Sequence, residues 1–281
     1  MGEPTVAVVV PTRGRADYLA VALPSILGQQ AGVDFEVIVV DDSSSDDSAE
    51  LAERLGARVV RLDEQRSGPN AGRNAGAAAT AAELIVYVDD DVRADPGWLR
   101  ELLEGAARYP TADVYGGPIR ASLEGPAPHG CGREPPPITT LDLGPADGAA
   151  ELVWSANMMI RRRALELAGP FDESMGVGGD EEEWLERVKA RGGGIFYLSA
   201  AGLDHRRRGD DARLRSLARS AFRRGRAMRR FDERRGSQPS LARELRVLAG
   251  CGWHTVRRGC PYGLVMGAHS LGRTVESVAR G

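Results

Sequence analysis

The sequence predicts an α/β protein in which a mostly parallel sheet is flanked by helices and followed by a helical C-terminal extension. Short apolar runs without a polar break alternate with segments of helical apolar spacing from Thr5 to about residue 205. Such runs are typical of strands buried on both faces, and their alternation with helices is typical of a right-handed, mostly parallel sheet. Acidic residues repeatedly follow the ends of the runs. Because the carboxyl ends of strands form the ligand crevice of an open α/β sheet, the same pattern predicts a site.

The first ninety residues predict four strands with helices between them. The segment that begins at Tyr18 has helical apolar spacing, with Pro24 as a residue that can kink it. Gly56 ends the second helix, and a turn from Ser67 to Gly76 opens into an Ala-rich third helix. The predicted strands are 5–10, 35–40, 58–62 and 84–88, and the predicted helices are 18–29, one that contains 51–55, and the segment after 76.

The next part of the chain is less regular. A helix over 96–108 is predicted, with Asp95 as its N-cap and Pro96 in its first turn, and a strand over 113–119 follows. Residues 120–150 are rich in Pro and Gly, which indicates a binding loop, a lid or an irregular excursion. The fold resumes over 151–159, a helix runs from Asp180 to Arg191, and 195–198 is predicted as the last strand.

The strand at 84–88 runs directly into three acids, Asp89, Asp90 and Asp91. If extended geometry persists, Asp89 and Asp91 point to one side and Asp90 to the other. Crowded carboxylates raise one another's pKa unless a cation or hydrogen-bond donors hold them ionised, and a divalent metal with hard oxygen ligands fits that need. The alternative is a solvated acidic turn that leads into the helix capped by Asp95.

Charge divides the 281-residue chain into two regions. Residues 1–204 contain 18 Lys and Arg against 34 Asp and Glu, a net charge of −16, while residues 205–281 contain 19 against 6, a net charge of +13. The chain is long enough for one large core plus an appendage. We therefore expect a domain over 1–205 and a basic helical extension over 206–281, whose anionic partner is a membrane surface, a nucleic acid or the acidic domain itself.

Two apolar stripes support helices in the extension. Such stripes usually pack against protein, which favours intramolecular contact or a homodimer, whereas a basic amphipathic helix that lies on a membrane is the alternative. One stripe comprises Leu214, Leu217, Ala221, Met228 and Phe231, and the other comprises Leu264, Ala268, Leu271, Val275 and Val278.

The three cysteines are too few and too scattered for a disulfide framework, which indicates a reducing compartment. Cys251, His254 and Cys260 are close enough in sequence to suggest zinc, but no fourth ligand has a recognisable spacing, so unpaired thiols are the favoured expectation. The N-terminus does not resemble a signal peptide, and no stretch reaches the roughly 20 apolar residues that span a bilayer. We expect a cytoplasmic protein, with membrane association through the extension as an option.

Several motifs in a fixed order then converge on one family. They are Val-Val-Val-Pro-Thr-Arg-Gly-Arg at 8–15, Val-Val-Asp-Asp-Ser at 39–43, Gly72-Arg73-Asn74 with Gly76, the acidic triplet, and Gly179-Asp180-Glu181-Glu182-Glu183. In order and spacing, residues 5 to about 205 resemble the family-2 glycosyltransferases, which have the GT-A fold, a Rossmann-like sheet between helices. The resemblance implies an inverting, metal-dependent transfer of sugar from a nucleoside-diphosphate sugar, with UDP favoured, to an acceptor hydroxyl.

The resemblance also implies where the donor binds. Pro11, Thr12 and Arg13 would meet the nucleotide, and Asp41 or Asp42 would hydrogen-bond its base, since base-edge and ribose donors need an acceptor. The Arg73-Asn74 pair would lie near the nucleotide or its phosphates. The acidic triplet would meet the diphosphate: Asp89 and Asp91 would be the DXD pair that holds Mn²⁺ or Mg²⁺, with Asp90 between them at the donor site. His205 matches a position near the metal, although a plain polar contact is an equal alternative for a lone histidine.

The family's Gly-Glu-Asp element aligns with Gly179-Asp180-Glu181, so the two acids are exchanged in this sequence. The resemblance implies that Glu181 is the general base and Asp180 its neighbour. Glutamate is one methylene longer than aspartate, and either carboxylate could deprotonate the acceptor, so both assignments stay open. Acids in a first helical turn are also favoured by the helix dipole alone.

Three other classes of protein are alternatives to this function. A sugar-nucleotide pyrophosphorylase would need a Gly-rich signature near the first strand, and the residues from Pro11 to Arg15 do not form one. A phosphoacceptor receiver module relies on a lysine near its acid, and the one lysine, Lys189, lies outside such a context. An inactive nucleotide-sugar-binding scaffold stays open. The acceptor, a saccharide, a lipid-linked molecule or a small molecule, does not follow from the sequence, and no nucleic acid is expected.

Overall fold

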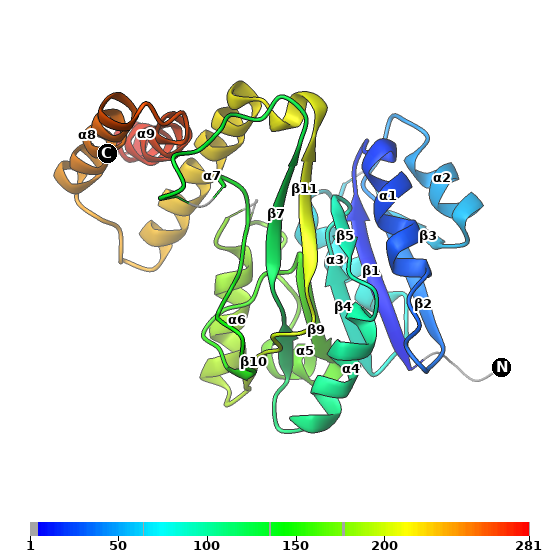
Figure 1. The fold of residues 1–281 in the computed structure, drawn as a ribbon. Helices are drawn as coiled ribbons and strands as arrows, with labels where there is room; N and C mark the ends of the chain where they lie inside the picture. The colour runs from blue at the N-terminus through cyan, green and yellow to red at the C-terminus, as the bar shows by residue number, and fades with distance from the viewer. Residues whose placement is uncertain (1–4, 64, 135, 176–177, 281) are drawn as a thin grey trace. The chain divides into compact units, whose positions relative to one another are not determined.

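The computed structural model describes residues 5–63, 65–134, 136–175 and 178–280 (Figure 1). The chain divides into two compact units. The first comprises Met1–Arg120, Leu141–Gly176 and Asp180–His205, and the second comprises Ala121–Thr140, Val177–Gly179 and Arg206–Gly281. The second unit therefore contains the basic extension together with most of the Pro- and Gly-rich segment that begins at 120.

An eight-stranded sheet forms the first unit, as the alternation of apolar runs predicted. Its order is β3-β2-β1-β4-β9-β6-β10-β8, in which β1 pairs in parallel with β2 and β4, and β9 lies antiparallel between β4 and β6. The strands are β1 (Val6–Thr12), β2 (Phe35–Asp41), β3 (Arg58–Arg61), β4 (Leu84–Val88), β6 (Val114–Gly116), β8 (Gly148–Ala149), β9 (Asn157–Arg161) and β10 (Ile195–Tyr197).

Alternate residues of the buried strands face two separate hydrophobic clusters. In β1, Val8 and Val10 pack into the cluster that contains Leu19 of α1, whereas Val9 packs into the cluster that contains Ala71 of α3. Both faces are thus covered by helices, which is why the strands are apolar throughout. The helices of this unit are α1 (Ala16–Leu27), α2 (Ser48–Leu55), α3 (Pro69–Ala78), α4 (Trp98–Arg108), α5 (Arg162–Ala168) and α6 (Asp180–Ala190).

Two glycines let α3 lie unusually close to β1. A Cβ atom on Gly76 would lie 2.2 Å from Val9 Cγ1, and one on Gly72 would lie 2.9 Å from Pro11 Cβ. Real Cβ atoms do not approach that closely, so any larger residue would push the helix away from the sheet. The close packing brings Arg73, which lies between these glycines in the helix, to the carboxyl end of the sheet.

A second sheet has the order β5-β11-β7 and contains a strand beyond the one that was predicted to be the last. Its strands are β5 (Val92–Ala94), β11 (Leu203–Arg208) and β7 (Ile119–Glu124). The prediction that 195–198 is the last strand was wrong, because β11 reads Leu-Asp-His-Arg-Arg-Arg and contains too few apolar residues to signal a strand. The single strand predicted over 113–119 is likewise two strands, β6 and β7, separated by Gly117 and Pro118.

The predicted cap of α4 was also wrong. The helix begins at Trp98, and its N-cap is Gly97, whose φ of 82° lies in the left-handed region that favours glycine. Asp95 instead accepts a 2.6 Å hydrogen bond from Arg120. A long-range ion pair therefore holds the carboxylate that the local sequence assigned to a helix terminus.

The second unit is built around three long helices, α7 (Leu214–Arg234), α8 (Leu241–Arg258) and α9 (Tyr262–Arg280). The predicted stripe on α7 is partly confirmed as a packing face, since Leu217, Ala221 and Phe231 are buried. Leu217 and Ala221 join a small cluster with Ile138 and Val265.

The stripe on α9 does not pack within the described part of the chain, so the intramolecular contact expected for it was wrong, and its contact in a homodimer stays a prediction. Leu264, Leu271, Val275 and Val278 are 40 to 65% exposed. Glycines make the actual contact: a Cβ on Gly225 of α7 would lie 2.0 Å from the His269 carbonyl oxygen, and one on Gly272 of α9 would lie 2.2 Å from the Phe222 carbonyl oxygen. Because the backbones touch at small residues, the bulky apolar residues of α9 face outward.

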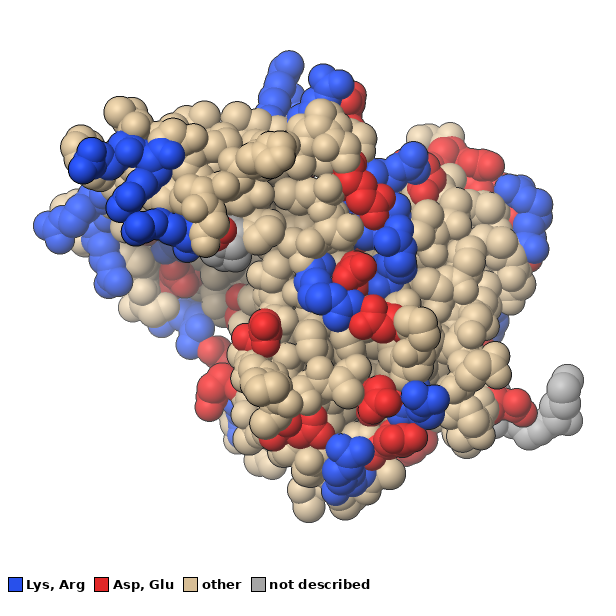
Figure 2. All heavy atoms as spheres, in the orientation of Figure 1, with Lys and Arg blue, Asp and Glu red and all other residues tan. Residues whose placement is uncertain are grey.

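Many of the ion pairs in this unit join its own residues. Glu276 accepts from Arg226 at 2.6 Å and lies 3.2 Å from Arg230, while Arg273 pairs with Glu244 and Asp232, at 2.7 Å each. Other arginines gather at the surface (Figure 2). Among the described residues, no helix is both long and apolar enough to cross a membrane.

Candidate active site

The site lies where β1, β2 and β4 end at the same edge of the sheet. Thr12, the last residue of β1, is the register partner of Asp41, the last residue of β2. β4 is parallel to both and ends at Val88, so Asp89 emerges beside them. The parallel register therefore gathers polar residues that are up to 78 positions apart in sequence.

Asp89, Asp91 and His205 form one cluster. One oxygen of each carboxylate and one ring nitrogen of His205 all lie within 4.8 Å of one another. The antiparallel pairing of His205 with Val92, in β11 and β5, places the imidazole beside Asp91, and its Nε2 lies 3.1 Å from Asp91 Oδ1. Asp91 and His205 are both buried. Two hard carboxylate oxygens and an imidazole nitrogen form a donor set that suits a divalent cation.

Asp90 makes different contacts from its two neighbours. Its carboxylate accepts a 2.8 Å hydrogen bond from Thr12 Oγ1 and lies 3.0 Å from Arg15 Nη1. Burial raises the pKa of Asp90 to about 7, with Asp91 and Asp89 adding to the rise and Arg15 and Thr12 opposing it. Arg15 also donates to Asp91 Oδ2 at 2.8 Å, so one guanidinium balances two of the three acids.

The predicted nucleotide-binding residues are held by a loop network. Asp42 Oδ2 accepts 3.0 Å hydrogen bonds from Ser67 Oγ and the Gly68 backbone N–H. Arg13 Nη1 lies 3.4 Å from Asp42 Oδ2 and donates to Ser67 at 2.9 Å. Asp41 accepts from the Ser44 backbone N–H at 3.3 Å. Pro11 packs against Gly72, so these residues come together at one end of β1 and β2.

Arg73 is a buried guanidinium at the centre of the second half of the site. It donates to Asn70 Oδ1 at 2.6 Å, to Asp180 Oδ2 at 2.7 Å and to Ser155 Oγ at 2.5 Å. Burial opposes its charge, but Glu181, Asp180 and Asp89 outweigh burial and raise the pKa of Arg73. In this structure Arg73 therefore contacts the two candidate bases directly.

Asp180 and Glu181 begin α6 and differ in exposure. The Asp180 side chain is 2% exposed and paired with Arg73, whereas the Glu181 side chain is 13% exposed and accepts a 2.6 Å hydrogen bond from Ser155 Oγ. Burial, reinforced by the charge of Asp180, raises the pKa of Glu181 to about 8 against the opposing effect of Arg73. A carboxylate with that pKa is suited to accept a proton at about pH 8, where a large part of it is ionised.

Asn74 does not join these side chains. Its amide donates to the Phe171 carbonyl oxygen and to Glu173 Oε1, both at 2.9 Å, and its oxygen accepts from the Phe171 backbone N–H at 2.9 Å. These bonds tie α3 to the segment that leads to α6. The implied placement of Asn74 near the nucleotide stays a prediction.

The sequence did not predict three residues that lie in the candidate site: Arg15, Ser67 and Ser155. Arg15 belongs to the Arg-Gly-Arg turn but resembles any other surface arginine in sequence. Ser155 precedes β9, and since Asn157 pairs with Val88, the antiparallel register carries Ser155 past the end of β4 into the site. Its one signal was a hydroxyl within an otherwise apolar stretch.

The sequence of this chain is similar to those of known proteins. Residues 7–168 match the family described as Glycosyl transferase family 2. The chain is 32% identical over 227 residues to the pre-mycofactocin glycosyltransferase of Mycobacterium tuberculosis, covering 77% of this chain and 45% of the relative. It is 29% identical over 222 residues to the O-antigen biosynthesis protein RfbC of Myxococcus xanthus, covering 73% of this chain and 17% of the relative. The chain thus spans less than half the length of both relatives.

Solved structures share the fold. A mannosyltransferase, PcManGT from Pyrobaculum calidifontis, in complex with GDP-Man and Mn²⁺, matches with a TM-score of 0.59 and 17% identity, over 100% of this chain and 77% of that chain. GalNAc-T7 with UDP, GalNAc and Mn²⁺ matches with a TM-score of 0.58 and 16% identity, over 79% of this chain and 47% of that chain. The fold is GT-A, and the family match covers more than half of the sequence. The chain belongs to the glycosyl transferase family 2.

Proposed function

We propose that the protein is an inverting, metal-dependent glycosyltransferase that uses a nucleoside-diphosphate sugar, with UDP as the favoured nucleotide. The observation that carries the proposal is the position of Arg73, whose charge is stabilised by Asp89 of the metal-ligand cluster and by the candidate bases Asp180 and Glu181. A donor held by the first group would therefore lie within reach of the second. Family membership and the GT-A fold support the same reading.

Asp89, Asp91 and His205 would hold Mn²⁺ or Mg²⁺ and face the donor diphosphate. Their oxygen and nitrogen atoms cluster closely enough to share one ion, and the carboxylates supply the hard ligands that both metals prefer. When bound, the ion neutralises the charge that develops on the leaving diphosphate. Arg15, already paired with Asp90 and Asp91, can remain as a second positive group beside the phosphates.

Asp41 or Asp42 would accept hydrogen bonds from the nucleotide base, with Pro11, Thr12 and Arg13 lining the same end of the sheet. Both carboxylates are buried, Asp41 at the end of β2 and Asp42 directly after it, which suits acceptors that bind an N–H edge. UDP is favoured by the family, although a solved neighbour holds GDP-Man.

Glu181 would take the proton from the acceptor hydroxyl. In the proposed single displacement, the acceptor oxygen bonds to the sugar C1 on the face opposite the diphosphate, the C1–O bond to the diphosphate breaks, and the proton passes to the Glu181 carboxylate. That geometry inverts the anomeric centre. Asp180, buried against Arg73, would hold the guanidinium in place.

Titration of the full chain with UDP-, GDP- and dTDP-sugars, with and without Mn²⁺, tests the proposal. We expect metal-dependent binding of a UDP-sugar and slow release of free sugar in the absence of acceptor. Turnover of a nucleoside triphosphate with a sugar phosphate would instead indicate a pyrophosphorylase. Tight, metal-dependent binding with no hydrolysis or transfer over a panel of acceptors would indicate a scaffold.

We further propose that the basic helical unit contacts an anionic membrane surface at the cytoplasmic side. On α8, Trp253 and Val256 are 67% and 81% exposed, and Arg246, Arg257 and Arg258 are exposed on the same helix. Tryptophan and arginine on one outward face suit the headgroup layer of a bilayer. A lipid-linked acceptor would be consistent with this placement.

Vesicle sedimentation tests the proposed membrane contact. Binding should rise with the fraction of anionic lipid, at about 1 kcal/mol per basic residue near the surface, and weaken with salt. Trp253→Ser with Val256→Ser should reduce it, whereas Val33→Ser with Leu143→Ser, exposed apolar residues of the first unit, should not. If the intact protein does not bind vesicles and sediments as a dimer, and the α8 variant sediments as a monomer, the exposed face is a protein interface.

A further inference from the structure

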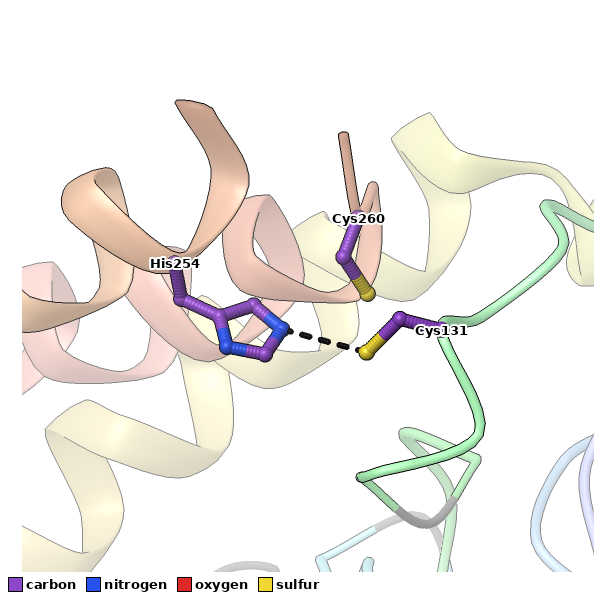
Figure 3. A group of neighbouring side chains, drawn as sticks. All are labelled: Cys131, His254 and Cys260. Atoms are coloured by element: carbon purple, nitrogen blue, oxygen red, sulfur yellow. Dashed lines mark hydrogen bonds between the residues drawn. The ribbon is translucent and has the colours of Figure 1, made fainter. Parts of the chain in front are cut away.

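A cluster of two cysteines and a histidine lies within the second unit. Cys131 comes from the Pro- and Gly-rich segment, His254 from the last turns of α8, and Cys260 from the turn before α9. The three side chains point toward one another (Figure 3). Their Sγ and ring nitrogen atoms all lie within 4.8 Å of one another, with Cys131 Sγ 3.5 Å from His254 Nε2.

The sequence suggested a different trio for zinc, Cys251, His254 and Cys260. Cys251 is buried, and its Cβ lies close to Gly267 of α9, so its thiol belongs to the helix contact. Cys131, 123 positions from His254, takes its place because the segment around it folds back on the helices. Sequence spacing could not reveal a ligand that distant.

The distances suit a tetrahedral metal ion. Zinc binds cysteine sulfur at about 2.3 Å and histidine nitrogen at about 2.0 to 2.1 Å, which places sulfur and nitrogen ligands about 3.6 Å apart in a tetrahedron. The observed separation of Cys131 Sγ and His254 Nε2 is 3.5 Å. No rearrangement of that pair would be needed to admit the ion between them.

The backbone conformation around Cys260 directs this residue toward the other two members of the cluster. Gly259 ends α8 with a φ of 59°, a left-handed conformation that favours glycine, and so turns Cys260 back toward His254. The loop approaches α9 closely, since a Cβ on Gly130 would lie 2.4 Å from Tyr262 Cε2. A side chain at position 130 would therefore displace Cys131 from the cluster.

We propose that Cys131, His254 and Cys260 bind one Zn²⁺ ion, with water in the fourth position, and that the ion fastens the segment around Cys131 to α8 and α9 of the same unit. His254 would ligate through Nε2 and carry its proton on Nδ1. The site belongs to the second unit and differs in chemistry from the Asp89, Asp91 and His205 cluster of the first, since soft sulfur selects zinc over Mn²⁺ and Mg²⁺. It is a structural clamp, not part of the transfer reaction.

Cobalt titration of the reduced, chelator-treated full chain tests the site. We expect one equivalent of Co²⁺ to give the visible bands of tetrahedral cobalt together with a thiolate-to-cobalt charge-transfer band, and Zn²⁺ to abolish both. Cobalt bound by Asp89, Asp91 and His205 would lack the charge-transfer band, which separates the two sites. Addition of Zn²⁺ to the metal-free wild type should also raise its melting temperature.

The variants Cys131→Ser, His254→Gln and Cys260→Ser should each weaken cobalt binding beyond the roughly 10- to 100-fold that loss of an outer-shell partner causes. Cys251→Ala is the matched control, since it removes a nearby thiol outside the cluster and should leave the spectrum unchanged. Absence of the charge-transfer band in the wild type, its loss in Cys251→Ala, or a Cys131–Cys260 disulfide that persists in a glutathione buffer would overturn the proposal.

Discussion

Asp91→Asn is expected to abolish metal-dependent donor binding, and Asp89→Asn to weaken it in the same direction. An amide is a poorer ligand for a hard cation than a carboxylate, and the change also removes a negative charge that the ion would balance. Because loss of a residue that only hydrogen-bonds a metal ligand already costs about 10- to 100-fold in metal affinity, loss of a ligand should exceed that range. Isothermal titration with the nucleotide sugar and Mn²⁺ measures the effect.

Asp204→Asn is the control for this experiment. Asp204 precedes His205 in β11 but pairs with Arg120 at 2.8 Å, so its loss should leave donor affinity unchanged. The fold of Asp91→Asn should persist, since Asp90 and Asp91 repel one another when no metal is bound. Full activity and full Mn²⁺ response in both site variants would show that these carboxylates do not hold the ion.

The second large effect is expected from Glu181→Gln, which should reduce turnover by about 10² to 10⁴, the usual range for loss of a general base. Donor affinity should change little, because Glu181 faces Ser155 and Arg73 and is not part of the metal-ligand cluster. Steady-state kinetics together with donor titration separates the two quantities. If Asp180→Asn eliminates turnover and Glu181→Gln retains it, the roles of the two acids are reversed.

The pH dependence of kcat/KM gives an independent measurement of the same group. Burial and Asp180 raise the pKa of Glu181 to about 8, and a general base works in its ionised form. Activity should therefore rise with pH through about 8 and fall as the carboxylate gains its proton at lower pH. Asp180→Asn removes the neighbouring charge, so its residual activity should show this limb at lower pH. If the rise in kcat/KM occurs at the same pH in Asp180→Asn as in the wild type, the charge of Asp180 does not act on the base.

The α/β core could be predicted from sequence because its signal is local. Val8 to Val10, Ile38 to Val40 and Ile85 to Val88 are apolar without interruption, and a strand covered on both faces requires that composition. The acids after these strands then lie together as a geometric consequence of parallel pairing. For the same reason, the sequence predicts that Asp41, Asp42 and the triplet from Asp89 to Asp91 lie at one crevice.

Only the tertiary structure shows the contacts that depend on pairing between distant segments of the chain. β11 has a charged sequence, and only its register with β5 brings His205 to Asp91. Ser155 and Arg15 reach the acids through contacts between distant segments, and Cys131 joins His254 in the same way.

The sequence by itself thus determined which strands are buried, the fold class and the position of the carboxylates at the strand ends, since each depends on neighbours within a few residues. It could not determine which face of α9 is buried, because Gly225 and Gly272 allow backbone contact where periodicity predicted Leu264 and Leu271. Side-chain hydrophobicity predicts burial when side chains make the contact. Where glycine lets two helices touch at the backbone, the closest approach decides, and that is a property of the assembled structure.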